Sequence, residues 1–582
     1  MSAPQSETAL KTIAMAIIIA VHFMLIALVL YLGNAEEFVV SAWEALQFCF
    51  IIALILLLVL YVLGRLFRGD WRCRYTVALA ALGLLIWVQG TVLIWDYGIL
   101  DGRNIDWSID AWRGWLDATL WVCVILSSLI FYRRVEKLFY KLAFAVVVIH
   151  IATTTYSSIT NLEKLNRSSG ADYNSDKALE EVYKFSTKNN IVHLMLDGFQ
   201  SDVFEDLMNH ETVGDEYRSQ FSGFTFYNET LGVFPYTRFS VPAFLGGKIY
   251  KNDTPKNDFI KSVLKGNTIL NVAYENDYDV DIASEAYFSA LYANGNHTNS
   301  HIISKDSVTD FKSQNAATIL DLTLFRVAPH FIKRYIYNNQ NWLIAPLFSS
   351  DDYLQHRYFS HTAFLNKLTE NMSVARDAPV YKYIHVMNAH NPMVVSPNCG
   401  YAGQTLNTTR ETLTVQSKCT LDTIIEYFKK MKDLGLYDNA LIIIHADHGG
   451  WVVPHKWKQK IYWKNGPEIS PLAASLASPL LAIKPPGSSS DSLSISPTLA
   501  SLADIPDTIS DIMNWDARFG GESVVSLDPG KLRDRKFYFY AWQRDAWETD
   551  YTGPIQEFLI TGSHFETPWR AGKIVLPTPT NY

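Results

Sequence analysis

The sequence predicts two parts: an α-helical membrane domain with five spans, followed by an α/β domain built on a largely parallel central sheet. The chain has 582 residues, of which 49% are hydrophobic, and nearly all of its long apolar runs lie before Ser157. After that point short apolar runs end at polar residues and alternate with helix-like stretches, which is typical of α/β domains. The length itself exceeds that of one ordinary domain.

Five apolar runs predict the membrane domain, residues 1–156. Each approaches the roughly 20 residues that a helix needs to cross a bilayer. A single run of this kind could be a buried core helix, and the fourth is short with Asp117 near its start. Five in succession indicate membrane spans: Ile13–Leu32, Ala45–Leu63, Tyr75–Trp95, Leu116–Tyr132 and Leu138–Tyr156.

Charged residues between the spans predict their orientation. Two loops are basic and two are acidic. The basic residues are Arg65, Arg68, Arg72, Arg74, Arg133, Arg134, Lys137 and Lys141, and the acidic ones are Glu36, Glu37, Asp96, Asp101, Asp106 and Asp110. Basic loops face the cytoplasm, so we expect a cytoplasmic N-terminus and an extracytoplasmic chain after Tyr156. The first span lacks a small-residue cleavage site and is expected to be retained.

The remainder of the chain is predicted to be a polar linker, 157–186, and a water-soluble domain, 187–582. Some helix is expected in the linker near Leu179–Phe185. The modest net charge of -8 argues against nucleic-acid binding. Cys399 and Cys419 are the only cysteines of this part, and in an oxidising compartment they are expected to pair, although two free thiols are the alternative.

Within the soluble domain, the ends of the predicted strands carry the polar residues of interest. In parallel sheets, ligands bind beyond the carboxyl ends of the strands, which is where Asp197, His390 and Asp447 fall. Helices are expected at Leu421–Leu434 and Pro497–Ala503. The predicted strands are Asn190–Leu196, Tyr278–Ile282, Val380–Met387, Ala440–Ile444 and Leu476–Ile483.

Asp197, Asp447 and His448 are the candidate metal ligands at these strand ends. Asp197 directly follows a buried strand, although Asp-Gly is also a common turn pair. Asp447 and His448 are adjacent and offer the mixed oxygen and nitrogen ligands that zinc and manganese accept. Gly449 follows them and allows a tight turn in a crowded site.

Thr237 is the candidate nucleophile and a further metal ligand. Ser240 is expected to cap a short helix, with Pro242 in its first turn and Gly246-Gly247 at its end. Thr237 would then lie just ahead of a helix N-terminus, which favours an anionic group; an ordinary turn threonine is the alternative. A divalent cation would stabilise its alkoxide.

Four more residues are candidate substrate contacts. Arg238 is adjacent to the nucleophile. His390 lies on a loop and could hold a substrate oxygen or donate a proton. His385 lies within a strand and could equally be a hydrogen-bonded core residue. His455, seven residues beyond His448, could contact ligand or substrate, or be a solvated loop histidine.

Together these motifs resemble the alkaline phosphatase and sulfatase superfamily. Within it they are most similar to the membrane-anchored lipid A phosphoethanolamine transferases, lipoteichoic acid synthases and glucan phosphoglycerol transferases. The segment 237–242 resembles the Thr-x-x-Ser-x-Pro nucleophile motif of the phosphoethanolamine transferases, and 447–449 matches their Asp-His-Gly. Their His-x4-His-x-Pro element resembles 385–392, and their paired cysteines resemble Cys399 and Cys419.

The resemblance implies a sulfatase-like fold and a metal-dependent enzyme of a bacterial inner membrane, with its catalytic domain in the periplasm. Such an enzyme moves a phospholipid-derived head group, phosphoethanolamine or phosphoglycerol, through a phospho-threonine intermediate onto a cell-envelope glycan or glycolipid. The cofactor is expected to be one divalent ion, zinc or manganese. The lipid donor and the envelope acceptor are the expected partners.

The chain also departs from that family pattern. Asp197 stands where the transferases often have Glu, and no Asp-x3-His element near His390 supplies a second metal set. A phosphodiesterase or phosphatase that uses water as acceptor is therefore one alternative, and a metal-free, non-catalytic envelope regulator is another. A classical sulfatase is not expected, because Thr237 cannot be converted to formylglycine.

Overall fold

The computed structural model describes the chain except for residues 1–2, 36–37, 39, 98–99, 101–104, 106, 109–110, 166–175, 304–310, 339–341, 349–356, 543–548 and 578–582. The acidic loop residues Glu36, Glu37, Asp101, Asp106 and Asp110 lie outside this part. The chain divides into two compact units. One consists of Met1–Ala171 and Val308–Gln355, and the other of Asp172–Ser307 and His356–Tyr582.

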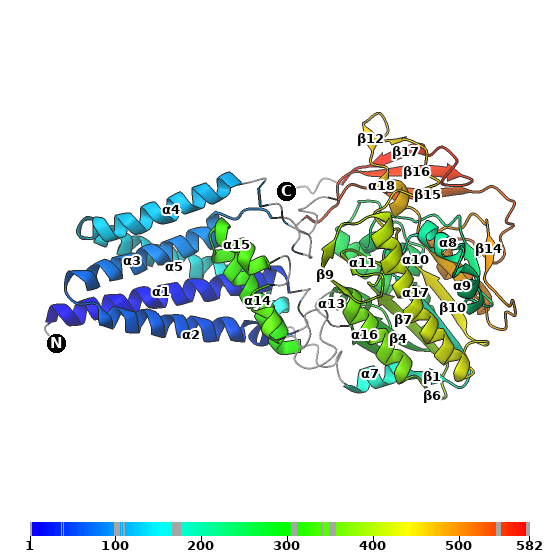
Figure 1. Ribbon diagram of the computed structural model, residues 1–582, viewed down its shortest axis with the longest axis horizontal. Coiled ribbons are helices and arrows are strands. Elements are labelled where there is room, and N and C mark those ends of the chain that lie inside the picture. The colour runs from blue at the N-terminus through cyan, green and yellow to red at the C-terminus, as the bar shows by residue number, and fades with distance from the viewer. Residues whose placement is uncertain are drawn as a thin grey trace. The chain divides into compact units, whose positions relative to one another are not determined.

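Five helices of the first unit are long and apolar enough to cross a membrane, as predicted (Figure 1). They begin or end beyond the apolar runs, because backbone hydrogen bonding continues into the flanking polar residues. A capping box formed by Ser41 and Glu44 starts the second helix. The third ends in a π-helical turn, η1 (Val88–Val92). The five are α1 (Ala3–Gly33), α2 (Ala42–Leu66), α3 (Asp70–Trp87), α4 (Ala111–Ile130) and α5 (Tyr132–Thr160).

The same unit includes a segment from much later in the chain. The sequence pattern does not predict that this segment packs with the spans. It consists of α14 (Phe311–Val327), α15 (His330–Tyr337) and the 3-10 helix η4 (Ala345–Phe348). Helix α14 packs against α1 and α2, and α15 packs against α4 (Figure 1). The helical unit is thus built from two separate stretches of sequence.

The second unit contains an eight-stranded sheet in the order β14-β3-β13-β10-β2-β7-β4-β5. The strands β10, β2, β7, β4 and β5 are mutually parallel, whereas β13 runs antiparallel to both of its neighbours. The predicted fold class, five membrane helices and a largely parallel α/β domain, is confirmed. The strands are β2 (Asn190–Leu196), β3 (Thr225–Tyr227), β4 (Asp279–Ser284), β5 (Asn299–Ile302), β7 (Val380–Val386), β10 (Leu441–His445), β13 (Leu481–Lys484) and β14 (Ser494–Ser496).

Both faces of this sheet are covered, so its central strands are buried throughout. Alternate residues of β2 enter two different cores: Val192 and Leu194 join one, and Ile191 and Met195 the other. The first core includes α8 (Ser201–Met208), α16 (Arg357–Glu370) and α17 (Arg410–Asp433). The second includes α10 (Thr237–Gly246), α11 (Lys256–Lys265), α12 (Ile269–Glu275) and α19 (Ile505–Ile512).

Two predicted elements differ from the structure. Only the end of the predicted strand Leu476–Ile483 is a strand, because its first residue closes α18 (Leu472–Leu476). The predicted helix Pro497–Ala503 is not one: Ser501 and Asp504 form a capping box, so the helical turns start there, with Pro506 in the first turn of α19.

Smaller elements complete the two units. The predicted linker contains α6 (Leu162–Leu165) and α7 (Asp176–Tyr183), the second at the place where some helix is expected. The remaining elements are β1 (Lys184–Ser186), α9 (Gly214–Gln220), α13 (Ala286–Tyr292), β6 (Ser373–Arg376), β8 (Met393–Val395), β9 (Tyr401–Leu406), β11 (Ile461–Tyr462), β12 (Glu468–Ile469), η6 (Leu502–Asp504), β15 (Asp534–Phe539), β16 (Ile555–Thr561) and β17 (Arg570–Val575).

Candidate active site

The carboxylates of Asp197 and Asp447 lie side by side at the carboxyl end of the sheet. They follow the parallel neighbours β2 and β10, whose register pairs Met195 with His445 and so brings the two acids level. The backbone N–H of Gly198 donates to Asp447 Oδ1 over 3.2 Å. Both acids are fully buried.

Each of these carboxylates has one oxygen without a hydrogen-bond partner among the described residues, Asp197 Oδ1 and Asp447 Oδ2. Two imidazoles face them. His448 Nε2 lies 3.3 Å from Asp447 Oδ2 and 3.7 Å from Asp197 Oδ1. His390 Nε2 lies 3.9 Å from Asp197 Oδ1. Asp197, His390 and His448 each offer a ligand atom, and these atoms lie within 4.8 Å of one another.

Backbone carbonyls determine the protonation of both imidazoles. His448 Nδ1 lies 2.8 Å from the Gly449 carbonyl oxygen, and His390 Nδ1 lies 2.7 Å from that of Asn391. A carbonyl only accepts, so each Nδ1 carries the proton and each Nε2 presents a lone pair. Asp197 Oδ1 and the two imidazole nitrogens therefore converge within 4.8 Å, with Asp447 Oδ2 beside His448, an arrangement that a cation satisfies.

The electrostatics of the cluster agree with this assignment. Burial and the neighbouring Asp447 raise the pKa of Asp197 well above its usual value. Burial opposes ionisation of Asp447 too, but His448 and the Thr237 hydroxyl hold its pKa below the usual value. Burial lowers the pKa of His390 to about 3, which leaves it neutral. A divalent cation would offset the repulsion between the two acids, so the residues present fit a metal ion.

Thr237 is the first residue of α10, and its hydroxyl donates to Asp197 Oδ2 over 3.3 Å. The expectation that Ser240 caps this helix is wrong. Its hydroxyl turns back to the Phe234 carbonyl, 3.1 Å away, and the helix begins one turn earlier. Gly247 ends the helix with a φ of 63°. The structure thus brings the nucleophile candidate to the helix N-terminus and to the candidate metal ligand Asp197 at once.

The glycine after His448 is required by packing. A Cβ at Gly449 would lie 1.9 Å from the Ser475 carbonyl oxygen. Gly198 has a φ of +71°, which side chains rarely adopt. The two short motifs Asp-Gly and Asp-His-Gly therefore reflect how closely the backbone approaches around the acids.

The three remaining candidate residues, His385, Arg238 and His455, differ in how deeply they are buried. His385 is buried behind Asp197: its Nε2 donates to Asp197 Oδ2 over 3.0 Å, and its Nδ1 lies 3.1 Å from the Tyr292 hydroxyl. It therefore positions the carboxylate instead of reaching a substrate. Arg238 is the half-buried second residue of α10. His455 is exposed, and it is not among the residues that form the described metal-ligand group.

Two residues near the cluster were not predicted. Glu285 follows β4 and precedes α13, and its Oε1 lies 3.0 Å from Arg357 Nε and 3.3 Å from His361 Nε2. The positive charge of Arg357 acts to lower the pKa of both Asp197 and His390. Glu285 carries the same signal as Asp197, a polar residue at a strand end. Arg357, at the start of α16, carries no such signal.

Aromatic rings flank the imidazoles. The Trp451 ring lies 4.7 Å from that of His390 and 5.4 Å from that of His448, measured between centroids. Tyr236 lies 6.3 Å from His448 and 5.4 Å from Trp542. Of the cluster's side chains, His390 is the most accessible, at 16% exposure, so the cluster opens toward the side where His390 lies.

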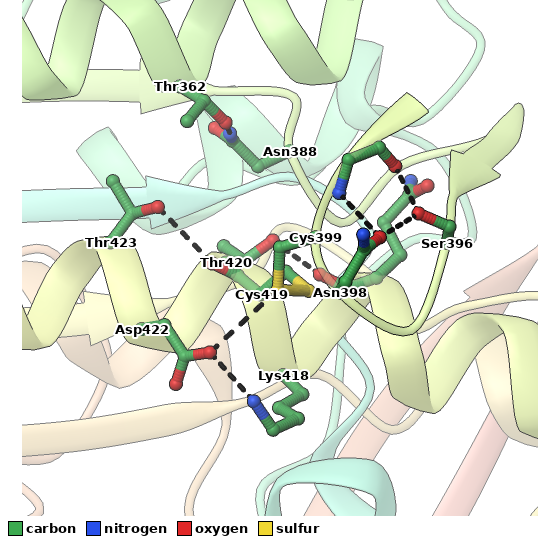
Figure 2. Close-up of a disulfide and its surroundings, with 12 residues drawn as sticks. Thr362, Asn388, Ser396, Asn398, Cys399, Lys418, Cys419, Thr420, Asp422 and Thr423 are labelled. Atoms are coloured by element: carbon green, nitrogen blue, oxygen red, sulfur yellow. Dashed lines mark hydrogen bonds and ion pairs between the residues drawn. A yellow bond between two sulfur atoms is a disulfide. The ribbon is translucent and has the colours of Figure 1, made fainter. Parts of the chain in front are cut away.

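A disulfide joins Cys399, in the loop between β8 and β9, to Cys419 on α17, as predicted. Figure 2 shows it beside Asp422, which lies 2.8 Å from Lys418. One turn before Cys419, Gln416 Nε2 donates to the His390 carbonyl and its Oε1 accepts from Val394 N, both over 3.0 Å. Helix α17 therefore supports the loop that carries His390.

Removing this disulfide with the double substitution Cys399→Ser and Cys419→Ser is expected to destabilise the α/β unit. A sequence separation of 20 corresponds to about 3 kcal/mol of lost stabilisation, or a fall of roughly 5 °C in melting temperature. Differential scanning fluorimetry of the detergent-solubilised protein measures it, with Cys123→Ser, an exposed free cysteine, as control. Metal content is expected to persist because the Gln416 hydrogen bonds remain; an unchanged melting temperature contradicts the prediction.

No protein-family model and no curated protein sequence matches this chain. Solved structures that it resembles include the lipoteichoic acid synthase LtaP from Listeria monocytogenes, at 10% identity and a TM-score of 0.38, covering 68% of this chain and 92% of the other. A protein in the alkaline phosphatase superfamily from Vibrio parahaemolyticus has 11% identity and a TM-score of 0.37, covering 67% and 80%.

A third is the C-terminal periplasmic domain of EcEptC from Escherichia coli in complex with Zn, at 11% identity and a TM-score of 0.34, covering 56% of this chain and 82% of the other. The names of these structures include the alkaline phosphatase superfamily and a lipoteichoic acid synthase. By identity and TM-score the likeness is weak, so the function proposed below rests on the side chains of the site.

Proposed function

We propose that this chain is a metal-dependent membrane phosphotransferase with Thr237 as its nucleophile. It moves a phospholipid-derived head group, phosphoethanolamine or phosphoglycerol, onto an envelope glycan or glycolipid. The reaction takes place on the periplasmic side of a bacterial inner membrane, with the N-terminus in the cytoplasm. The observation that carries the proposal is a threonine hydroxyl at a helix N-terminus that donates to Asp197, whose unpaired second oxygen faces the Nε2 atoms of His390 and His448.

Asp197, Thr237, Asp447 and His448 would hold the metal ion, and His390 faces the same point. Zinc and manganese both accept this mixture of carboxylate and imidazole ligands. When bound, a divalent ion stabilises an alkoxide and polarises a phosphoryl oxygen. His390, whose pKa burial holds well below the usual value, is neutral and acts as a ligand and not as the proton donor.

The chain's own groups account for the remaining chemistry. Asp197 Oδ2 accepts the hydrogen bond of the Thr237 hydroxyl and is itself oriented by His385. The N-terminus of α10, where Thr237 lies, favours phosphoryl oxygens. Thr237 Oγ1 attacks phosphorus as its proton passes to Asp197 Oδ2, and the bond to the diacylglycerol oxygen breaks. Diacylglycerol leaves with that proton, and a phosphodiester remains on Thr237. An acceptor hydroxyl then attacks the same phosphorus, and its proton passes to Thr237 Oγ1 as the bond to Thr237 breaks.

Arg357 is a candidate for a second contact with the phosphoryl oxygens, because its charge acts on both Asp197 and His390 and its side chain is 34% exposed. Arg357→Ala is expected to lower kcat/KM for head-group transfer by roughly 100-fold, the cost of losing one donor to a charged transition state. Arg357→Lys should recover part of the lost kcat/KM. Arg218→Ala, which removes an arginine paired with the exposed Asp215, is the matched control. Equal rates for Arg357→Ala and the control would rule out this role.

Head-group release tests the proposed function as a whole. Purified protein is incubated with vesicles of phosphatidylethanolamine or phosphatidylglycerol, with zinc or manganese, and mass spectrometry detects diacylglycerol and an adduct on the peptide that contains Thr237. Metal-dependent release with the adduct identifies the donor. Release of free head group without any acceptor favours a hydrolase. No release from either lipid by metal-loaded protein excludes both as donors, and failure to bind metal favours the envelope regulator.

A further inference from the structure

The segment 311–348 belongs in sequence to the α/β unit but in space to the membrane helices. The chain leaves the α/β unit after β5 and returns to it just before Arg357. Between these points it forms α14, α15 and η4, which pack with α1, α2 and α4. Contacts with three membrane helices therefore hold this segment in the helical unit.

Asp117 of α4 anchors the start of α15. Its Oδ2 accepts from the backbone N–H of His330 over 3.0 Å and from Gln89 Nε2 over 3.1 Å. Its Oδ1 accepts from Trp95 Nε1 over 3.1 Å. The side chain is fully buried. A charged residue that weakens the apolar character of the fourth span is thus used to hold another helix against it.

Two further contacts bring the segment close to the spans. Gly114, one turn before Asp117, has no side chain where α15 crosses: a Cβ there would lie 2.8 Å from Phe331 Cζ and 3.0 Å from His330 Cδ2. Arg326 Nε of α14 donates to the Gly90 carbonyl over 2.9 Å. The inner face of α15 is consequently buried, whereas its outer face is not.

Apolar side chains make up most of that outer face, and Arg334, beside Tyr335, is the one exposed charge within α15. Phe331, Ile332 and Tyr335 of α15 are 42%, 50% and 62% exposed, and Leu347 of η4 is 75% exposed. The face is continuous with the outer surface of the spans. The Phe331 ring lies 6.0 Å from Trp115 of α4, and the Phe348 ring lies 4.7 Å from Phe48 of α2.

Helices α2 and α4 are also the spans whose apolar side chains are least covered by protein, together with α5. Near the ends adjoining the segment, three exposed tryptophans occur on them, Trp43, Trp112 and Trp115. Tryptophan and tyrosine gather at the level of the lipid head groups, and an amphipathic helix beside a span buries its apolar face at that boundary.

We propose that the outer face of α15 and η4, formed by Phe331, Ile332, Tyr335 and Leu347, lies in the interfacial layer of the phospholipid bilayer. The sequence of the α/β domain thus contains a membrane-inserted segment, and the α/β unit is tied to the membrane at this point as well as at α5. This inference does not depend on the proposed transferase activity.

Spin-label accessibility tests it on the full chain in phospholipid vesicles. Cys49, Cys73 and Cys123 are first replaced by alanine, and a nitroxide is attached at Ile332→Cys or Leu347→Cys. Two exposed leucines are references: Leu58, at 61% in α2, and Leu532, at 69% in the α/β unit. Power saturation compares collisions with oxygen, which enters lipid, and with a nickel chelate, which stays in water.

Labels at 332 and 347 are expected to favour oxygen over nickel, as the label at 58 does and the label at 532 does not. Gly114→Leu, which displaces Phe331, should shift the label at 332 toward nickel while leaving the label at 58 unchanged. Nickel accessibility like that at 532 would place the face in water and overturn the proposal. Low accessibility to both reagents would show that protein covers the face, either a second copy or the α/β unit, and would overturn it equally.

Discussion

Asp447→Asn is expected to remove the metal from the purified protein and to abolish head-group transfer. Asp447 Oδ2 is buried, has no hydrogen-bond partner among the described side chains, and lies 3.3 Å from His448 Nε2. An asparagine places a neutral amide there. The expected loss of metal affinity is at least about 100-fold, the upper end of what losing an outer-shell partner costs. Metal content by inductively coupled plasma mass spectrometry, after dialysis against limiting zinc, measures it.

The metal-free protein separates loss of a ligand from general damage. Asp447 contributes to the raised pKa of its neighbour Asp197, but His448 and the Thr237 hydroxyl hold its own pKa below the usual value, so the effects of removing its charge oppose each other. The apo melting temperature of Asp447→Asn should therefore stay close to that of the unmodified protein, while the rise on adding zinc disappears.

His455→Ala is the matched control for that experiment. His455 is exposed, whereas Asp447 is fully buried beside His448, although the place of His455 after Asp-His-Gly makes it a ligand candidate by sequence. Its removal should change neither metal content nor the zinc-dependent rise in melting temperature. Full metal content in Asp447→Asn, or loss of metal in His455→Ala, would show that the ligand set is wrong.

The acids of the site could be predicted because a parallel sheet brings the carboxyl ends of its strands to one edge. Asp197 and Asp447 each follow a strand of the predicted sheet, and the strand register makes them neighbours. The helix near Thr237 could be predicted from its glycines, but not its first residue. The Ser240 side chain bonds to a carbonyl instead of capping, a choice that short-range sequence does not determine.

Other features of the site and of the helical unit could not be predicted, because they depend on contacts between residues far apart in the sequence. His385 resembles a core histidine in sequence, and only its 3.0 Å contact with Asp197 identifies its role. Arg357 reaches the site from a helix that follows a long excursion of the chain. Helix α14, 17 residues long with charged residues, lacks the apolar length of a span, so its packing against α2 could not be recognised from sequence.

Thr237→Ala is expected to lower head-group transfer by roughly a thousandfold or more and to eliminate the covalent adduct, because no hydroxyl remains to attack phosphorus. Alanine suits the first turn of α10, so the fold should be retained, and the melting temperature of the apo protein checks this. Thr237→Ser keeps the hydroxyl and should keep both the adduct and measurable transfer.

The two Thr237 variants distinguish a role of Thr237 as nucleophile from a role as metal ligand. Thr237 Oγ1 donates to Asp197 Oδ2 over 3.3 Å, so its loss weakens metal binding less than the loss of Asp447, whose carboxylate contributes charge. Thr237→Ala protein saturated with zinc should therefore remain inactive. Transfer restored by excess zinc would mean that Thr237 acts only through the metal, and transfer without an adduct would mean that the acceptor attacks the lipid phosphorus directly.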